Sequence, residues 1–311
     1  MLKGCRNRWP LTFMDGFIAE GGLGPVVNKK IGFVGAGNMG EAFVGAVIRS
    51  NLFEPAQICS SDVDQGRRDH IREIYGISAT RDNVELFTDC EIIVLAVKPQ
   101  EIHGVLAEVA GRKDYRIPHR KLVITIAAGI PIRKIEDVLY APLDDLERAN
   151  LPIIRVMPNT PALVLSGMSG MSANGNAREE DVRITRSILE AMGRVLEFKE
   201  EDLDAVTALS GNGPAYVFYL IESMIEGGIH VGLDPDDAAV LTMTTLKGAL
   251  KLIEERNESP ERLRQKVTSP GGTTEASFRV LEYNRVKAVI IEAIAAGARR
   301  SKQLSLELKK K

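Results

Sequence analysis

A short segment rich in hydroxyls and glycines, Val267 to Glu275, contains residues that could bind a small anion. It reads Val-Thr-Ser-Pro-Gly-Gly-Thr-Thr-Glu and lies between two strongly helical stretches. Pro and Gly are the least favourable residues in a helix interior, so Pro270, Gly271 and Gly272 must end one helix before another begins at about Thr274. The unpaired amides and positive dipole at such a helix start can hold a carboxylate or a phosphate without Arg or Lys.

The same segment also fits a simple turn between two helices. In that interpretation Ser269 and Thr273 cap the second helix, and Glu275 satisfies its first turn. The loop taken alone favours this simpler interpretation, so the choice depends on motifs elsewhere in the chain.

A glycine-rich motif follows the first predicted strand. Residues 35–40, Gly-Ala-Gly-Asn-Met-Gly, come directly after the apolar run Ile31 to Val34 and open a predicted helix, which is the context that a dinucleotide fingerprint requires. The glycines would permit a tight turn, close approach of the backbone to a pyrophosphate, and packing of the helix on the sheet. A glycine-rich turn without a ligand is the alternative. We expect a dinucleotide to contact Gly35, Gly37, Asn38, Met39 and Gly40.

Asp62 stands at the end of the second predicted strand, about 25 residues after the first glycine, where a carboxylate accepts hydrogen bonds from the adenosine ribose. A carboxylate repels a 2′-phosphate and so favours NADH, but Arg67 and Arg68 one turn later could offset that repulsion. Alternatively, Asp62 caps the helix that follows. The cofactor is therefore NADPH or NADH.

Three further predicted strands end at the sheet edge where open α/β folds bind ligands. Residues 96–99 follow one strand, residues 127–129 the next and residues 157–161 the third. Each segment taken singly could be an ordinary loop. The candidate cofactor contacts in these segments are Ala96, Val97, Lys98, Pro99, Ala128, Gly129 and Asn159.

The elements that must position these motifs fall into two groups. From Lys30 onward, continuous apolar runs alternate with amphipathic stretches, which is typical of a mostly parallel, Rossmann-type sheet covered on both faces. Beyond residue 198 all segments read as helices. We predict an α/β fold with an N-terminal extension over 1–28, flexible or peripherally packed, a dinucleotide-binding domain over 29–198, and an all-α dimerisation and substrate domain over 199–311.

The helical region contains many large apolar residues for its length, so we expect a partner subunit to cover part of its surface. The expected assembly is an obligate homodimer, or a larger homo-oligomer. We expect the last predicted helix, over 274–308, to be interrupted near Tyr283, Asn284 and Arg285, because Asn tolerates the left-handed conformation of a helix end.

Composition argues against several classes of protein. A hydrophobic fraction of 44%, a charged fraction of 26% and a net charge of −2 over 311 residues give no basic surface for nucleic acid. The apolar runs are shorter than a bilayer requires, so we expect no membrane span. Three widely spaced cysteines fit the cytoplasm better than a disulfide framework. Four scattered histidines lack ligand spacing, so we expect no metal.

The chain resembles pyrroline-5-carboxylate reductase over residues 29–308. The matching segments keep the family's order and spacing, and those in the helical region are the most specific: 31–40, 96–99, 127–129, 155–162, 204–216 and 267–275. The resemblance implies a Rossmann domain and an interlocking helical dimer. It also implies reduction of 1-pyrroline-5-carboxylate to L-proline, the last step of proline biosynthesis, by hydride transfer from NADPH or NADH.

The resemblance assigns roles to the hydroxyl- and glycine-rich segment. Ser269, Gly271, Gly272 and Thr273 would hold the substrate carboxylate. Thr274 would bind the ring nitrogen and act as the catalytic residue, orienting and polarising the imine rather than ionising.

The resemblance also bears on the cofactor. Asn83 matches a cofactor contact on the adenosine side. Asp62 stands where relatives that prefer the phosphorylated cofactor carry a hydroxyl, and Asn212 stands where Ser is frequent.

Two other functions compete with this one. A β-hydroxyacid dehydrogenase shares the same plan but uses a helical Lys paired with Asn, and Lys247 and Lys251 have no such partner within one turn. A dinucleotide-sensing scaffold would have lost its substrate site, whereas residues 269–274 are intact. Oligomer size, cofactor preference, proline feedback, the role of residues 1–28 and strictness among cyclic imino acids stay open.

Overall fold

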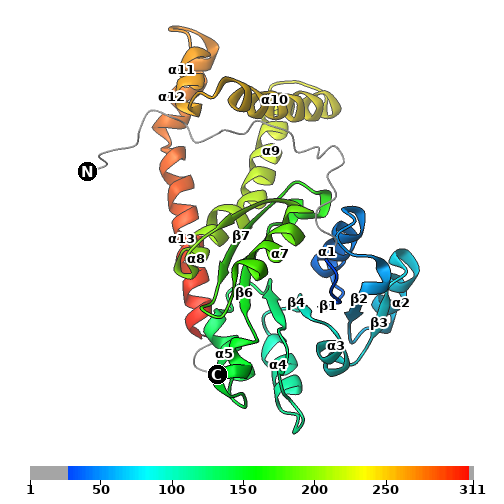
Figure 1. The fold of residues 1–311 in the computed structure, drawn as a ribbon. Helices are drawn as coiled ribbons and strands as arrows, with labels where there is room; N and C mark the ends of the chain where they lie inside the picture. The colour runs from blue at the N-terminus through cyan, green and yellow to red at the C-terminus, as the bar shows by residue number, and fades with distance from the viewer. Residues whose placement is uncertain (1–26, 308–311) are drawn as a thin grey trace. The chain divides into compact units, whose positions relative to one another are not determined.

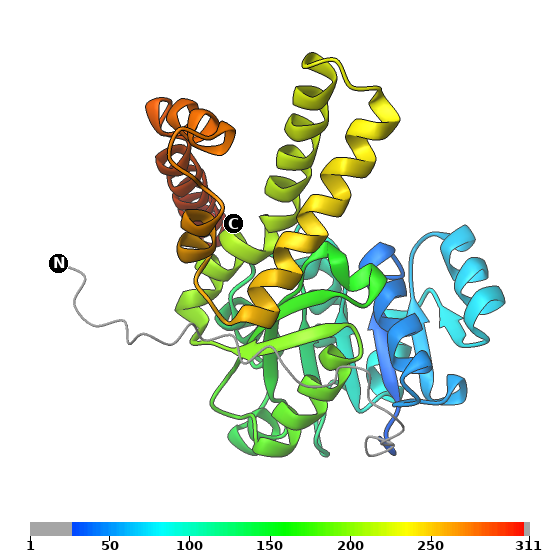
Figure 2. The same ribbon diagram turned by 90° about the horizontal axis from the view of Figure 1, so that it is seen from above.

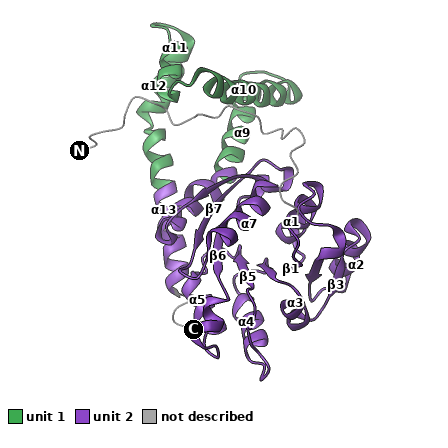
Figure 3. Cartoon of the chain, in the orientation of Figure 1, with its two compact units in different colours: residues 1–22, 215–293 green, residues 23–214, 294–311 purple. Residues whose placement is uncertain are grey.

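The computed structural model describes residues 27–307, so nearly all of the predicted N-terminal extension lies outside the described residues. The described chain forms two compact units (Figure 3). The sheet unit comprises residues 27–214 and 294–307, and the helical unit comprises residues 215–293.

An eight-stranded sheet forms the centre of the sheet unit (Figure 1). The strand order is β3-β2-β1-β4-β5-β6-β7-β8, and all neighbouring strands are parallel except the antiparallel pair β6 and β7. The mostly parallel Rossmann-type sheet is therefore confirmed. Its strands are β1 (Ile31–Val34), β2 (Ile58–Ser61), β3 (Ser78–Thr80), β4 (Ile92–Leu95), β5 (Leu122–Thr125), β6 (Ile153–Met157), β7 (Gly167–Ala173) and β8 (Gly193–Glu197).

Helices cover both faces of this sheet (Figure 1). They are α1 (Asn38–Arg49), α2 (Gln65–Tyr75), α3 (Asn83–Asp89), α4 (Ile102–Ala110), α5 (Ile132–Leu139), α6 (Asp145–Ala149) and α7 (Glu179–Glu190). Neighbouring residues of a strand point to opposite faces, so Phe33 belongs to one apolar cluster with Phe43 of α1, and Val34 to the other with Leu106 of α4. Burial on both faces explains why these strands read as continuous apolar runs.

Short turns complete the sheet unit. Three 3₁₀ segments are η1 (Pro55–Gln57), η2 (Thr160–Val164) and η3 (Glu200–Asp202). Helix α8 (Leu203–Val206) continues into a π-helical turn, η4 (Thr207–Gly211), at the start of the helical region. π-helical turns are rare and frequently lie at functional sites.

The remaining helices are α9 (Gly213–His230), α10 (Pro235–Arg256), α11 (Pro260–Lys266), α12 (Thr273–Tyr283) and α13 (Val286–Glu307). Helices α9 and α10 are joined by a short turn (Figure 2), and the Asp234 side chain caps α10 by accepting the Asp236 amide at 2.9 Å. The predicted break in the last helix is confirmed. Within the predicted stretch the left-handed residue is Arg285, with φ 52°, and not Asn284, which has φ −83°.

Large apolar side chains of these helices face solvent in the single chain. Helix α9 has no buried residue, and Phe218 and Tyr219 are 64% and 72% exposed. On α13, Val289, Ile290 and Ile291 are also exposed. Exposed apolar side chains in this number are typical of a surface that another molecule covers.

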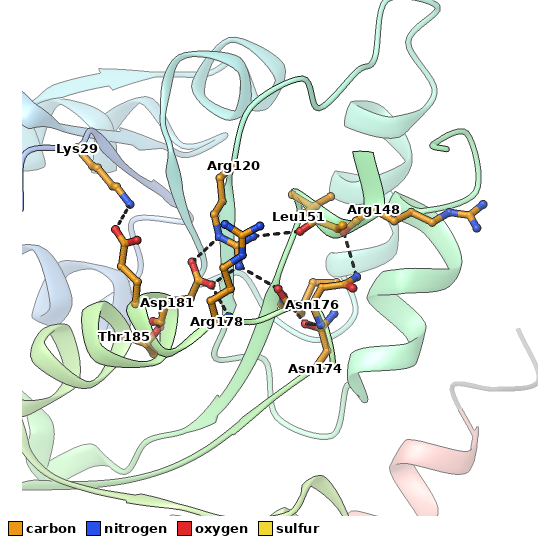
Figure 4. Close-up of polar contacts among 12 residues, drawn as sticks. Lys29, Arg120, Arg148, Leu151, Asn174, Asn176, Arg178, Asp181 and Thr185 are labelled. Carbon is orange, nitrogen blue, oxygen red and sulfur yellow. Dashed lines mark hydrogen bonds and ion pairs between the residues drawn. The ribbon is translucent and has the colours of Figure 1, made fainter. Parts of the chain in front are cut away.

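A buried polar network holds the start of α7 against the loops that precede β5 and β6 (Figure 4). The Arg120 guanidinium pairs with the Asp181 carboxylate, whose side chain is 2% exposed, and donates to the carbonyl of Asn176 at 2.9 Å. Asp181 also accepts the Arg178 amide at 2.7 Å. Arg120 precedes the amino end of β5, so this network stabilises the sheet edge opposite to the ligand-binding edge of such folds.

Candidate active site

The glycine-rich turn of residues 35–40 connects β1 to α1. Gly35 has φ +103°, and a Cβ there would lie 2.8 Å from the carbonyl oxygen of Ala96. A Cβ at Gly40 would lie 2.1 Å from the carbonyl oxygen of Gly35. Both positions therefore require glycine. A Cβ at Gly37 would meet nothing within 4 Å, so a ligand can approach the backbone there.

The amino end of α1 follows directly from this turn. Gly37 occupies the cap position, and no side chain caps the helix. Gly37 and Asn38 are exposed, while Met39 is half-buried. First-turn amides without side-chain acceptors and the helix dipole suit a pyrophosphate, so this turn fits a dinucleotide.

The Asp62 carboxylate braces the same turn. Its Oδ2 accepts the Ala36 amide at 2.8 Å, and its Oδ1 accepts the Asp64 amide at 2.9 Å. Asp64, not Asp62, caps α2 by accepting the amide of Arg67 at 3.0 Å. The alternative interpretation of Asp62 as a helix cap is therefore wrong.

Arg67 and Arg68, which could offset the charge of Asp62, are both engaged. Arg67 donates from Nε to the carbonyl oxygen of Ala36 at 2.8 Å and pairs through Nη2 with Glu41 at 2.5 Å. Arg68 is buried and donates from Nη1 to the carbonyl oxygen of Asp62 at 2.6 Å. Its Nη2 donates to Gln65.

Glu41 holds Arg67 beside the turn. Its Oε1 also bonds Nε2 of His70 at 2.9 Å. Burial favours the neutral acid, but hydrogen bonds from Arg67 and His70 outweigh that effect and lower the pKa of Glu41 below its ordinary value. Glu41 therefore keeps its charge and its hold on Arg67.

Other predicted cofactor residues lie beyond the carboxyl ends of β4 and β5. Ala96 and Val97 are half-buried, and Pro99 follows the exposed Lys98. Ala128 is exposed, and Gly129 adopts φ +75°. The structure thus places these segments at the same sheet edge as the glycine-rich turn, as parallel strands require.

The side chain of Asn159, after β6, forms hydrogen bonds within the sheet unit. Its Oδ1 accepts the Met168 amide at 2.9 Å, and its Nδ2 donates to both the carbonyl and the hydroxyl oxygen of Ser210 at 3.3 Å. Ser210 lies in the π-helical turn η4. Sequence reasoning did not find this link, although both residues belong to segments that carry the family resemblance.

Asn83, the first residue of α3, is also bonded within the chain. Its Oδ1 accepts the Ser61 hydroxyl at 2.8 Å, and its Nδ2 donates to Glu108 at 2.9 Å. The Asn83 side chain thus lies beside the carboxyl end of β2, where Ser61 is followed by Asp62.

The hydroxyl- and glycine-rich loop connects α11 to α12. Gly271 has φ +73°, and its amide donates to Oε2 of Glu275 at 2.8 Å. Gly272 occupies the cap position of α12, and no side chain caps this helix. In the alternative interpretation of this loop as a simple turn, the caps assigned to Ser269 and Thr273 are therefore wrong, while Glu275 does satisfy one amide of the loop.

Three hydroxyls of this loop are available to a ligand. Among the described residues, the hydroxyls of Ser269, Thr273 and Thr274 have no hydrogen-bond partner. The flanking helices hold the loop through Arg264, whose guanidinium lies 4.9 Å from the ring centroid of Phe278. The carbonyl of Arg264 also accepts the Thr268 hydroxyl at 2.7 Å.

Other features do not contribute to the candidate site. A cavity of about 760 Å³ lies beside the amino ends of β4 and β5 and contains none of the predicted site residues. Within residues 27–307, no cluster of three His, Cys, Asp or Glu side chains could hold a metal ion. The helices in that range are all too short or too polar to span a bilayer.

The sheet and its glycine-rich turn, followed by a helical region, define a dinucleotide-binding protein with a Rossmann-type domain. Residues 30–129 match the family described as NADP oxidoreductase coenzyme F420-dependent, and residues 200–304 match the family described as pyrroline-5-carboxylate reductase dimerisation. The chain belongs to the pyrroline-5-carboxylate reductase family.

Curated relatives match over nearly their whole length. Pyrroline-5-carboxylate reductase of Synechocystis is 38% identical over 88% of this chain and 98% of the relative. The enzyme of Methanosarcina acetivorans is 37% identical over 89% and 98%, respectively.

Solved structures of the same family are also similar to this chain. Plasmodium falciparum pyrroline carboxylate reductase with NADP bound has a TM-score of 0.78 and 31% identity, with 89% of this chain and 98% of the other covered. The pyrroline-5-carboxylate reductase of Coxiella burnetii has a TM-score of 0.78 and 35% identity, with the same coverage. The resemblance predicted from the sequence is confirmed, and the chain is an NAD(P)H-dependent oxidoreductase that forms a homo-oligomer.

Proposed function

We propose that this chain reduces 1-pyrroline-5-carboxylate to L-proline with NADPH or NADH, as the final step of proline biosynthesis. The observation that carries the proposal is the hydroxyl- and glycine-rich loop of residues 268–275, in a chain that also carries the uncapped glycine-rich turn. The loop offers three hydroxyls without partners among the described residues and a glycine amide that already binds a carboxylate.

The reaction needs no strong acid from the protein. The substrate is a cyclic imine whose nitrogen can already carry a proton. When bound, NAD(P)H supplies the hydride that adds to the imine carbon, and the ring nitrogen keeps its proton as it becomes an amine. The chain has to hold the carboxylate and orient the ring, which accounts for a loop without His, Cys or Lys.

In this proposal Ser269, Gly271, Gly272 and Thr273 bind the substrate carboxylate. The carboxylate displaces Glu275 from the Gly271 amide, a group of the same charge and geometry. Thr274 is the catalytic residue, because the hydroxyl of this half-buried residue accepts a hydrogen bond from the protonated ring nitrogen and fixes the imine.

In this proposal the dinucleotide binds at the edge of the sheet formed by the carboxyl ends of the parallel strands. The amides of residues 37–40 bind the pyrophosphate, and Asp62 accepts ribose hydroxyls. Residues 29–198 are proposed as the dinucleotide-binding domain and residues 199–311 as the dimerisation and substrate domain. The remaining proposed cofactor contacts are Asn83, Ala96, Val97, Lys98, Pro99, Ala128, Gly129 and Asn159.

The assembly proposed is a homodimer, in which a second copy covers the exposed apolar side chains of α9 and α13. A cytoplasmic location is also proposed, since Cys59 and Cys90 are free thiols.

The β-hydroxyacid dehydrogenase alternative finds less support. Lys247 and Lys251 of α10 are both exposed, and Lys251 pairs with Glu255 at 3.6 Å rather than with an Asn. The sensing scaffold would require an impaired substrate loop, whereas its hydroxyls and glycines are all present.

An absorbance assay that follows cofactor oxidation in parallel with NADH and NADPH tests the proposal. Oxidation is expected on addition of pyrroline-5-carboxylate. Oxidation with the keto partner of a hydroxyacid alone would favour the dehydrogenase, and cofactor binding without oxidation would favour the scaffold.

A further inference from the structure

We propose that this enzyme prefers NADH to NADPH because the Asp62 carboxylate occupies the place that a 2′-phosphate would need. The inference rests on the proposed function in one respect, namely that a nicotinamide dinucleotide binds along the glycine-rich turn. It selects one of the two cofactors that the family assignment leaves open.

The carboxylate is fixed in place. Asp62 accepts the Ala36 amide at 2.8 Å through one oxygen and the Asp64 amide at 2.9 Å through the other. An ionised carboxylate has about four lone-pair positions, so roughly two remain for further donors. Because Asp62 lies at the carboxyl end of β2, these positions face the place of the adenosine ribose in such folds.

A ribose and a ribose 2′-phosphate present opposite groups to this carboxylate. The hydroxyls of NADH donate hydrogen bonds that Asp62 can accept. The 2′-phosphate of NADPH carries only acceptor oxygens and negative charge, so it gains no hydrogen bond there and is repelled. Swinging Asp62 aside would leave the Ala36 amide without its acceptor and loosen the turn that binds the pyrophosphate.

The neighbouring arginines do not compensate for this repulsion. Arg68 is 8% exposed and donates to the carbonyl of Asp62 and to Gln65. Arg67 is held by the carbonyl of Ala36 and by Glu41. Turning Arg67 toward a phosphate would break its ion pair with the half-buried Glu41 carboxylate.

Arg81 is a third arginine near Asp62 that could bind a 2′-phosphate. It follows Thr80, whose carbonyl accepts the Asp62 amide at 3.2 Å, and its side chain is exposed. Ion pairs of exposed arginines contribute little, because ordering of the side chain and salt screening offset the attraction. The relative from Plasmodium falciparum binds NADP, so the fold itself admits the phosphate and local residues must make the choice.

Titration of the full-length protein with NADH and with NADPH, followed by nicotinamide fluorescence at one fixed salt concentration, tests the inference. We expect NADH to bind at least about 10-fold more tightly, equivalent to about 1.4 kcal/mol. Asp62→Ser should weaken NADH binding much more than NADPH binding, because both cofactors share the turn that Asp62 holds through Ala36 but only NADH loses its ribose acceptor. The ratio of the Kd for NADPH to the Kd for NADH should therefore fall at least about 10-fold. Asp62→Asn, which keeps one acceptor oxygen, should move the ratio in the same direction and serves if Asp62→Ser fails to fold.

Asp64→Asn is the matched control, because it removes an equal charge two residues away while Asn still caps α2. In this control the ratio of the Kd for NADPH to the Kd for NADH should stay within about 2-fold of the parent value. Equal or tighter binding of NADPH by the parent protein would overturn the inference, and so would a Kd ratio unchanged in both Asp62 variants. Loss of NADPH binding alone in Arg81→Ala would assign the phosphate to Arg81 instead.

Failure of this inference differs from failure of the proposed function. Equal use of both cofactors in reducing pyrroline-5-carboxylate would remove the preference and keep the function. A preference for NADH in titrations without any reduction of that substrate would do the reverse.

Discussion

The amide of Gly271 donates a hydrogen bond to the carboxylate of Glu275 at 2.8 Å, within the loop proposed to bind the substrate carboxylate. Glu275 also pairs with Arg279 one turn further along α12, at 3.4 Å. The loop therefore binds a carboxylate of its own chain. In the proposed function the substrate carboxylate would displace Glu275, which would make Glu275 an intramolecular competitor, with Arg279 as its alternative partner.

Glu275→Gln should lower the KM for pyrroline-5-carboxylate about 3- to 10-fold with little change in kcat, because a neutral amide competes less well for a backbone N–H than a carboxylate does. Steady-state kinetics at saturating NADH measure both constants. Glu261→Gln, at an exposed residue of α11, should change neither. An unchanged or raised KM in Glu275→Gln would show that Glu275 does not compete with the substrate.

Thr274→Ala should lower kcat roughly 10- to 100-fold, as expected when one positioning hydrogen bond is lost. NADH should bind this variant with its normal Kd, and Thr274→Ser should recover most of the rate because it restores the hydroxyl. Steady-state kinetics and a fluorescence titration measure the two effects separately. Full turnover in Thr274→Ala would remove Thr274 from the reaction.

Two glycines of the β1–α1 turn should respond differently to alanine. Gly37→Ala should leave the melting temperature nearly unchanged, since its Cβ meets nothing within 4 Å, but should weaken NADH binding about 10-fold or more by blocking the approach of the pyrophosphate. Thermal unfolding without cofactor and NADH titration measure these effects. Normal NADH affinity in Gly37→Ala would place the dinucleotide elsewhere.

Gly40→Ala should destabilise the protein itself by about 1–3 kcal/mol, because the added Cβ would lie 2.1 Å from the carbonyl oxygen of Gly35. Denaturant unfolding without cofactor measures the loss. An unfolding midpoint equal to that of the parent would mean that the turn relaxes freely around this residue.

Arg120→Ala should cost about 3 kcal/mol of unfolding free energy, because it leaves the buried Asp181 carboxylate without its ion-pair partner. At a temperature well below unfolding, kcat should stay normal, since the pair lies at the amino end of β5. Urea unfolding monitored by circular dichroism measures the loss. Glu179→Ala on the same helix breaks an exposed pair with Arg183 and should cost less than about 1 kcal/mol, and an equal loss in both variants would contradict a special role for Asp181.

The sequence predicted those parts of the fold whose signals are local and repeated. β2 was predicted as Ile58 to Ser61 and has these bounds, because a buried parallel strand is a continuous apolar or small-residue run between turn residues. β3, Ser78–Thr80, was missed, since a three-residue edge strand without an apolar run has no such signal. Arg285, rather than Asn284, takes the left-handed conformation, because Asn284 is the C-cap of α12 and the left-handed conformation falls on the residue after the cap.

The candidate site was less predictable in its details. Helix α12 begins at Thr273, one residue before the predicted start, so Gly272 takes the cap position expected for Thr273. The bonds from Ala36 to Asp62 and from Gly271 to Glu275 depend on side-chain directions that residue spacing does not encode. The motifs could thus be found from sequence, while the groups that occupy their amides could not.

The central claim is that the chain reduces pyrroline-5-carboxylate at the loop of residues 269–274. The most direct measurement is the amount of proline formed per NADH oxidised by the purified full-length protein, with the Thr274→Ala variant in parallel. We expect one proline for each NADH consumed and a roughly 10- to 100-fold slower reaction in the variant. NADH binding without formation of proline, or equal rates in both proteins, would contradict the claim.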